Sequence, residues 1–114
     1  MEWGSRSGSL EIAVSQADGA RLVRLTGEFD LAGVDGFERK LQGEPGSRED
    51  TLVLDLSGLT FIDSSGLRAV VMVDHRVRAE GKRCLIVRGP ERVERVLELT
   101  GVGERLELVD RFPG

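Results

Sequence analysis

The sequence is short of several residue types on which whole classes of function depend. One cysteine and one histidine in 114 residues allow no intrachain disulfide and no Cys/His metal cluster. A net charge of −4 argues against nucleic-acid binding, which favours a basic face. No apolar run approaches the roughly 20 residues that cross a bilayer, and the start lacks the apolar core of a signal peptide. We therefore expect a cytoplasmic protein with no metal or other cofactor.

Length and composition indicate one globular domain. Hydrophobic residues make up 39% and charged residues 32% of the chain, which is usual for soluble proteins. A chain of 114 residues can enclose one core but not two. Residues 1–9 are polar and rich in glycine and serine, so we expect a flexible N-terminal tail there. The domain should then span residues 10–110, with a C-terminal tail at 111–114.

The spacing of apolar residues predicts the first part of the fold. Alternating apolar residues indicate strands at 10–14 and 21–30, and the Asp18-Gly19 pair between them is typical of a hairpin turn. From Leu31 to Leu41 apolar residues recur every three or four positions, which predicts a helix with Asp30 as its N-cap. The chain therefore begins with an antiparallel hairpin followed by a helix.

The later elements alternate between strand and helix. A nearly continuous apolar run at 51–56 is typical of a strand buried on both faces, and residues 43–50 before it have the composition of a loop. We expect further strands at 83–89 and 105–110, and helices that end at Gly81 and Gly101. The order β-β-α-β-α-β-α-β predicts an α/β fold: a mixed, mostly parallel sheet with an antiparallel edge strand, flanked by helices.

Polar residues gather at the ends of two predicted strands. Glu28 and Asp30 end the second strand, and the segment "IDSSG" follows the third and contributes Asp63, Ser64 and Ser65. Functional groups of open α/β sheets collect beyond the carboxyl ends of the strands. If these two strands are neighbours in the sheet, the two groups of side chains lie close together.

Three interpretations of "DSSG" compete. Asp63 or Ser64 would cap the helix that begins here, which leaves the hydroxyl of Ser65 free. A catalytic serine would need a base, but His75 lies about ten residues into the same helix, roughly 15 Å from Ser65. The third interpretation is a hydroxyl that another protein modifies. We expect no enzyme, while capping and modification both remain open from the residues alone.

Four segments together resemble the STAS domain of anti-sigma factor antagonists. They are "GEFDLAG", "LVLDLSGLTFIDSSGLRAVV", "GKRCLIV" and "VERVLELTGVGERLEL", in the order expected in that family, and the resemblance runs from about Leu10 to Asp110. It implies the STAS fold. It also implies a protein that binds an anti-sigma factor with GHKL-type serine kinase activity and so frees a sigma factor.

The resemblance further implies a phosphorylation switch. The kinase would modify the second serine of the motif, here Ser65, with Ser64 as the alternative acceptor, and the complex would then dissociate. A metal-dependent serine phosphatase would restore the binding form. The residues that would border the partner surface are Glu28, Asp30, Thr60, Phe61, Asp63, Ser64, Ser65 and Gly66.

Elementary electrostatics agrees with a switch that acts on binding. A phosphate adds about −1.5 to −2 charge at pH 7, which a helix start favours by only ~0.3–1 kcal/mol, while Asp30 and Asp63 oppose it. The fold should therefore survive modification. The alternative is an accessory STAS subunit of a lipid-transport ABC system or a stress-signalling scaffold, because one fold serves several roles. The intact "DSSG" favours the antagonist, since an accessory subunit needs no phosphoacceptor.

Overall fold

Six strands in sequence order form a single sheet. The structure is a computed structural model, which describes residues 3–7, 9–42 and 49–112. Its elements are β1 (Trp3–Ser7), β2 (Leu10–Ala17), β3 (Ala20–Phe29), α1 (Leu31–Gln42), β4 (Thr51–Ile62), α2 (Ser64–Ala79), β5 (Arg83–Val87), α3 (Glu91–Thr100), a 3-10 turn (Val102–Arg105) and β6 (Leu108–Val109). β1, β2 and β3 pair antiparallel, and β3 to β6 pair parallel. The predicted α/β class and element order are confirmed from β2 onward.

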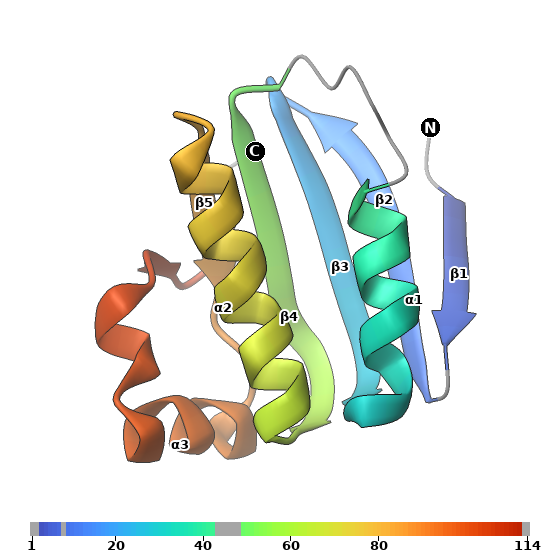
Figure 1. Ribbon diagram of the computed structural model, residues 1–114, viewed down its shortest axis with the longest axis vertical. Coiled ribbons are helices and arrows are strands. Elements are labelled where there is room, and N and C mark those ends of the chain that lie inside the picture. The colour runs from blue at the N-terminus through green and yellow to red at the C-terminus, as the bar shows by residue number, and fades with distance from the viewer. Residues whose placement is uncertain (1–2, 8, 43–48, 113–114) are drawn as a thin grey trace.

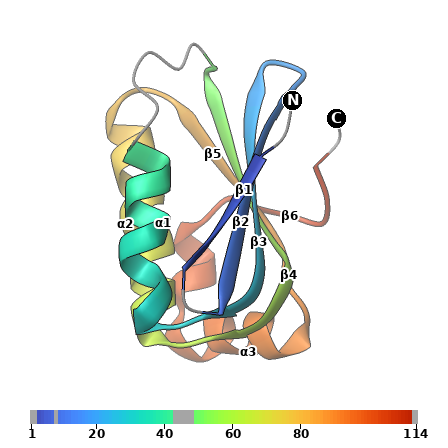
Figure 2. The same cartoon turned by 90° about the vertical axis from the view of Figure 1, so that its right-hand side faces the viewer.

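The helices cover one face of the sheet. Figure 2 shows α1 and α2 on the same side of the sheet, and Figure 1 shows them next to each other. The third helix, α3, contributes Val93 and Leu97 to the same core cluster. Of the apolar run predicted at 51–56, residues 52–56 are buried and Thr51 is half-buried. On the face without helices, Val53 belongs to a second, smaller cluster against which Phe112 packs. Both faces of β4 are therefore covered, one by helices and one by this cluster.

The prediction of a tail before Leu10 is wrong over residues 3–7. These residues form β1, which pairs with β2 from Trp3 opposite Val14 to Ser7 opposite Leu10. An edge strand is held by main-chain hydrogen bonds, which need no hydrophobic period, so the polar sequence gave no signal. As a result β2 lies inside the sheet and is not its antiparallel edge. Residues 1, 2 and 8 lie outside the described part.

The predicted C-terminal tail at 111–114 is wrong at Phe112. Phe112 packs on the second cluster, because a lone aromatic side chain can cover apolar surface without any periodic neighbours. Residues 113–114 lie outside the described part, and so does most of the loop predicted at 43–50. The last strand is shorter than the predicted 105–110, since only Leu108 and Val109 pair with β5.

The turn chemistry of the sequence is found where it was predicted. Asp18 and Gly19 both have positive φ, 53° and 76°, the conformation that a two-residue hairpin turn between twisted strands requires. Gly81 follows the end of α2, where the amide of Lys82 donates to the carbonyl oxygen of Val77 at 3.1 Å. Gly101 ends α3 in the left-handed conformation. Local signals therefore set the limits of these elements.

Candidate functional site

β3 and β4 are neighbours in the sheet and their carboxyl ends meet, which is the condition under which the two polar groups were expected to lie close together. Phe29 pairs with Ile62 at the end of the parallel ladder, and the amide of Asp63 donates to the carbonyl oxygen of Phe29 at 3.2 Å. Both helices begin directly after these strands, at the lower end of the sheet in Figure 1. The group that contains Asp30 and the group that contains Ser64 therefore share one surface.

An aspartate caps each of the two helices. In α1, Oδ1 of Asp30 accepts a hydrogen bond from the amide of Ala32 at 3.1 Å. In α2, Asp63 is the N-cap, and its Oδ1 accepts from the amide of Gly66 at 3.0 Å. The predicted cap at Asp30 is confirmed, and Asp63 is the capping residue of "DSSG". The serines are therefore not needed as caps.

Ser64 and Ser65 are the first two residues of α2. Ser64 is exposed and Ser65 is half-buried. Within the described ranges neither hydroxyl has a hydrogen-bond partner in the protein. Two serine hydroxyls without a structural task thus lie at the point where the two strands and two helices meet.

Gly66 differs from the other residues that were predicted to face a partner, because it is buried. A Cβ atom at this position would lie 2.4 Å from the carbonyl oxygen of Phe29 and 2.9 Å from its Cγ. The helix can approach β3 this closely only because residue 66 has no side chain. Gly66 therefore positions the start of α2 and offers no side chain to a partner, which corrects the sequence-based grouping.

Two irregularities in β4 decide which way its last residues face. At the first, β3 advances two residues from Arg24 to Thr26 while β4 advances three, from Asp55 to Gly58. At the second, β3 advances one residue from Gly27 to Glu28 while β4 advances two, from Leu59 to Phe61. At each step β4 holds one residue more than β3, which is the definition of a β-bulge. The predicted strand at 51–56 therefore extends to residue 62 through two bulges.

The second bulge turns Phe61 toward solvent. Strict alternation would place Leu59 and Phe61 on one face, yet Leu59 is buried and Phe61 is 44% exposed. Thr60, the additional residue, donates from Oγ1 to the carbonyl oxygen of Gly27 at 3.2 Å. No signal in the sequence reveals this bulge, because it arises from pairing with β3.

Leu31 is a second exposed apolar residue at this end of the sheet. It is the first residue of α1 and 72% exposed, whereas the helical spacing placed it on the buried stripe with Leu41. The first turn of the helix lies at the edge of the core, so the period alone overestimates its burial. The surface thus combines two apolar side chains with the carboxylates of Glu28, Asp30 and Asp63.

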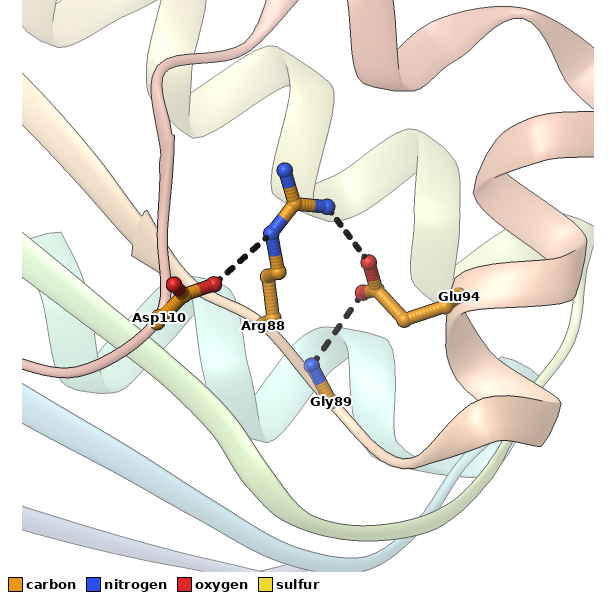
Figure 3. Close-up of polar contacts among 4 residues, drawn as sticks. All are labelled: Arg88, Gly89, Glu94 and Asp110. Carbon is orange, nitrogen blue, oxygen red and sulfur yellow. Dashed lines mark hydrogen bonds and ion pairs between the residues drawn. The ribbon is translucent and has the colours of Figure 1, made fainter.

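The next strand end along the sheet is occupied by a structural network, shown in Figure 3. Arg88 follows β5, and its Nη1 donates to Oε1 of Glu94 at 2.8 Å while its Nε lies 3.3 Å from Oδ1 of Asp110. The other oxygen of Glu94 accepts from the amide of Gly89 at 3.2 Å. This network joins the start of α3 to the segment after β6, so its charged side chains are paired with one another within the protein.

Cys84 is a buried free thiol. It lies in β5 with no exposed surface. Burial raises the pKa of the thiol to about 12, and the nearby carboxylate of Asp74 adds to the effect. The thiol is therefore protonated at neutral pH and a poor nucleophile.

Two further features are absent from the described residues. No group of three His, Cys, Asp or Glu side chains there is arranged to hold a metal ion. None of the helices in that part of the chain has the length and apolar character that crossing a membrane requires.

Comparison with known proteins agrees with this architecture. The STAS domain family matches residues 11–112, and the chain therefore belongs to that family. BtrV of Bordetella bronchiseptica, which is named as an anti-sigma factor antagonist, is 27% identical over 92 residues, or 81% of this chain and 79% of BtrV.

Solved structures share the fold. The crystal structure of an anti-sigma factor antagonist from Mycobacterium paratuberculosis superposes with a TM-score of 0.78 at 23% identity, over 91% of this chain and 88% of that one. The Bacillus cell fate determinant SpoIIAA in its phosphorylated form superposes with a TM-score of 0.63 at 21% identity, over 88% and 92% of the two chains.

Proposed function

We propose that this protein is an anti-sigma factor antagonist that phosphorylation of Ser65 switches off. In this cycle it binds an anti-sigma factor with GHKL-type serine kinase activity and so frees a sigma factor. The kinase then modifies Ser65, the complex separates, and a metal-dependent serine phosphatase restores the binding form. Sigma factors act on transcription, so the proposal places the protein in the cytoplasm. The chain itself supplies a binding surface and an acceptor hydroxyl, and the catalysis belongs to its partners.

The observation that carries the proposal is the pair of hydroxyls that the fold does not use. Asp63 alone supplies the side-chain cap of α2, which leaves both serines available. The names of the relatives and the solved phosphorylated form of SpoIIAA support the same function. Ser65 matches the second serine of the family motif and is the proposed acceptor, with Ser64 as the alternative.

We infer that the partner surface surrounds these serines. An exposed aromatic side chain within a polar rim is the usual anchor of a protein interface, and Phe61 has that position here. Gly66 supports the surface from beneath. The side chains that we assign to the interface are those of Glu28, Asp30, Leu31, Thr60, Phe61, Asp63, Ser64 and Ser65.

The charge of a phosphate accounts for the loss of binding. Phosphorylation adds about −1.5 to −2 charge at pH 7. One like charge ~4 Å away costs about 4 kcal/mol at an effective dielectric constant of 20, which is nearly a thousandfold in affinity. The start of a helix tolerates an anion, so the modified protein keeps its fold.

The test uses three immobilised proteins in a lysate of the source organism: the wild type, Ser65→Asp and His75→Asp. His75 is exposed on the same helix, about 15 Å further along it, and controls for a charge placed outside the site. The wild type and His75→Asp should both retain a GHKL-type kinase, and Ser65→Asp should lose it. Equal retention by all three proteins, above all of transporter subunits, contradicts the proposal.

The acceptor is identified with the retained kinase and ATP. Ser64→Ala should be phosphorylated to the same extent as the wild type, and Ser65→Ala should remain unmodified, as measured by intact mass. Modification of Ser65→Ala with none of Ser64→Ala would move the acceptor to Ser64.

A further inference from the structure

Arg68 lies beside the two serines on the surface of α2. It is exposed, three residues after Ser65 and four after Ser64. Helical residues three or four apart are surface neighbours, and long side chains lean toward the start of their helix. The guanidinium of Arg68 can therefore reach the first turn, where both hydroxyls lie.

No acidic side chain is paired with Arg68 in the described residues. Within the described ranges it makes no hydrogen bond or ion pair. The positions that surround it on the helix surface carry no charge, since they are occupied by Ser64, Ser65, Val71 and Met72. While the serines are unmodified, this arginine therefore has no ion-pair partner within the described residues.

The geometry of such a pair already exists further along α2. Arg78 binds Asp74, four residues before it, with Nε 3.0 Å from Oδ1. An arginine of this helix therefore reaches an anion one turn earlier. A phosphoserine extends further from the backbone than an aspartate, so Arg68 can reach a phosphate three or four residues before it.

We propose that Arg68 is the internal partner of a phosphate on Ser65. Phosphorylation transfers the terminal phosphoryl group of ATP: an Oγ–P bond forms, the bond from that phosphorus to the bridging oxygen breaks, ADP leaves and the hydroxyl proton is released. The planar guanidinium then binds two phosphate oxygens. Modification thus adds a negative charge and also removes the free cation of Arg68 from the surface.

This inference rests on the proposed acceptor site, but its test requires no kinase. Three proteins are prepared with phosphoserine incorporated at position 65 during synthesis. One is otherwise wild type, one also carries Arg68→Gln and one also carries Arg92→Gln. Arg92 is an exposed arginine on α3 and is the matched control. The readout is the second pKa of the phosphate, ordinarily about 6, from a phosphorus-31 NMR titration.

In the wild type and Arg92→Gln the phosphate pKa should be lower than in Arg68→Gln by about half a pH unit or more, because a nearby cation favours the dianion. Equal values in all three proteins would overturn the inference. Urea unfolding of the unmodified variants should coincide, which excludes a loss of structure. Because the phosphate is installed without a kinase, equal pKa values in this titration would not contradict the proposed kinase binding. Equally, failure to retain a kinase in the lysate experiment would not contradict the pairing of Arg68 with the phosphate.

Discussion

Gly66 lies directly against Phe29, and this contact joins the proposed phosphorylation site to the end of β3. A Cβ atom on Gly66 would come within 2.4 Å of the carbonyl oxygen of Phe29, the same oxygen that accepts the amide of Asp63. Backbone contacts with the end of β3 therefore fix the position of the first turn of α2. The orientation of Ser64 and Ser65 depends on a residue that has no side chain.

The Gly66→Ala variant should lose stability. The new methyl group meets backbone, which cannot move away as a flexible side chain would, so we expect a loss of about 1–3 kcal/mol. The matched control is Gly103→Ala, where the nearest atom to the new Cβ would be 3.5 Å away, an ordinary contact. The measurement is the urea midpoint, and equal midpoints for the two variants would show that α2 can shift to relieve the contact.

Removal of the cap should separate the role of Asp63 from that of the serines. Asp63→Ala loses the acceptor for the amide of Gly66 and should destabilise the protein by about 0.5–2 kcal/mol, whereas Asp63→Asn keeps a capping oxygen. Ser64→Ala and Ser65→Ala should unfold at the wild-type urea concentration. If Ser64→Ala lost as much stability as Asp63→Ala, the serine would contribute to the cap.

Cys84 should make stability fall at alkaline pH. The folded thiol has a pKa of about 12 against an ordinary value of 9.0, so between these values the unfolded chain releases a proton that the folded chain keeps. Stability from this group is complete below pH 9 and is lost as the pH rises toward 12.

The comparison that isolates this thiol is with Cys84→Ala, which has no thiol to titrate. The difference in unfolding free energy between the two proteins should change by about 1.4 kcal/mol per pH unit above pH 9. Parallel pH profiles would show that the folded thiol ionises near its ordinary pKa.

Phe61→Ala should weaken kinase binding without changing stability. Phe61 is 44% exposed, so removal of its ring leaves the core intact and should alter unfolding by less than about 0.5 kcal/mol. An aromatic anchor of an interface contributes about 2 kcal/mol or more, which is roughly thirtyfold in affinity. Leu99 on α3 is 80% exposed, so Leu99→Ala is the control for loss of surface apolar area. Calorimetric titration measures the affinity of both variants for the kinase.

Most of the fold and part of the site geometry follow from local sequence patterns. The hairpin at Asp18-Gly19, the helix stops at Gly81 and Gly101 and the cap at Asp30 each depend on residues within one turn of each other. The alternation of strands and helices brings the ends of β3 and β4 together, because parallel strands joined by right-handed crossovers end at one edge of the sheet. The sequence therefore indicated which polar residues would meet if the two strands were neighbours, and the sheet order shows that they are.

Contacts between distant segments decided the rest. β1 exists because β2 offers an open edge, and the bulge at Thr60 that turns Phe61 outward exists because β4 is one residue longer than its partner there. The burial of Gly66 depends on Phe29, which is 37 positions earlier in the numbering. Hydrophobic period, caps and turns are properties of neighbouring residues, so they can be recognised in a single sequence. Strand register and close backbone approach are set by which segments pair across the sheet, so only the tertiary structure determined the shape of the surface around Ser65.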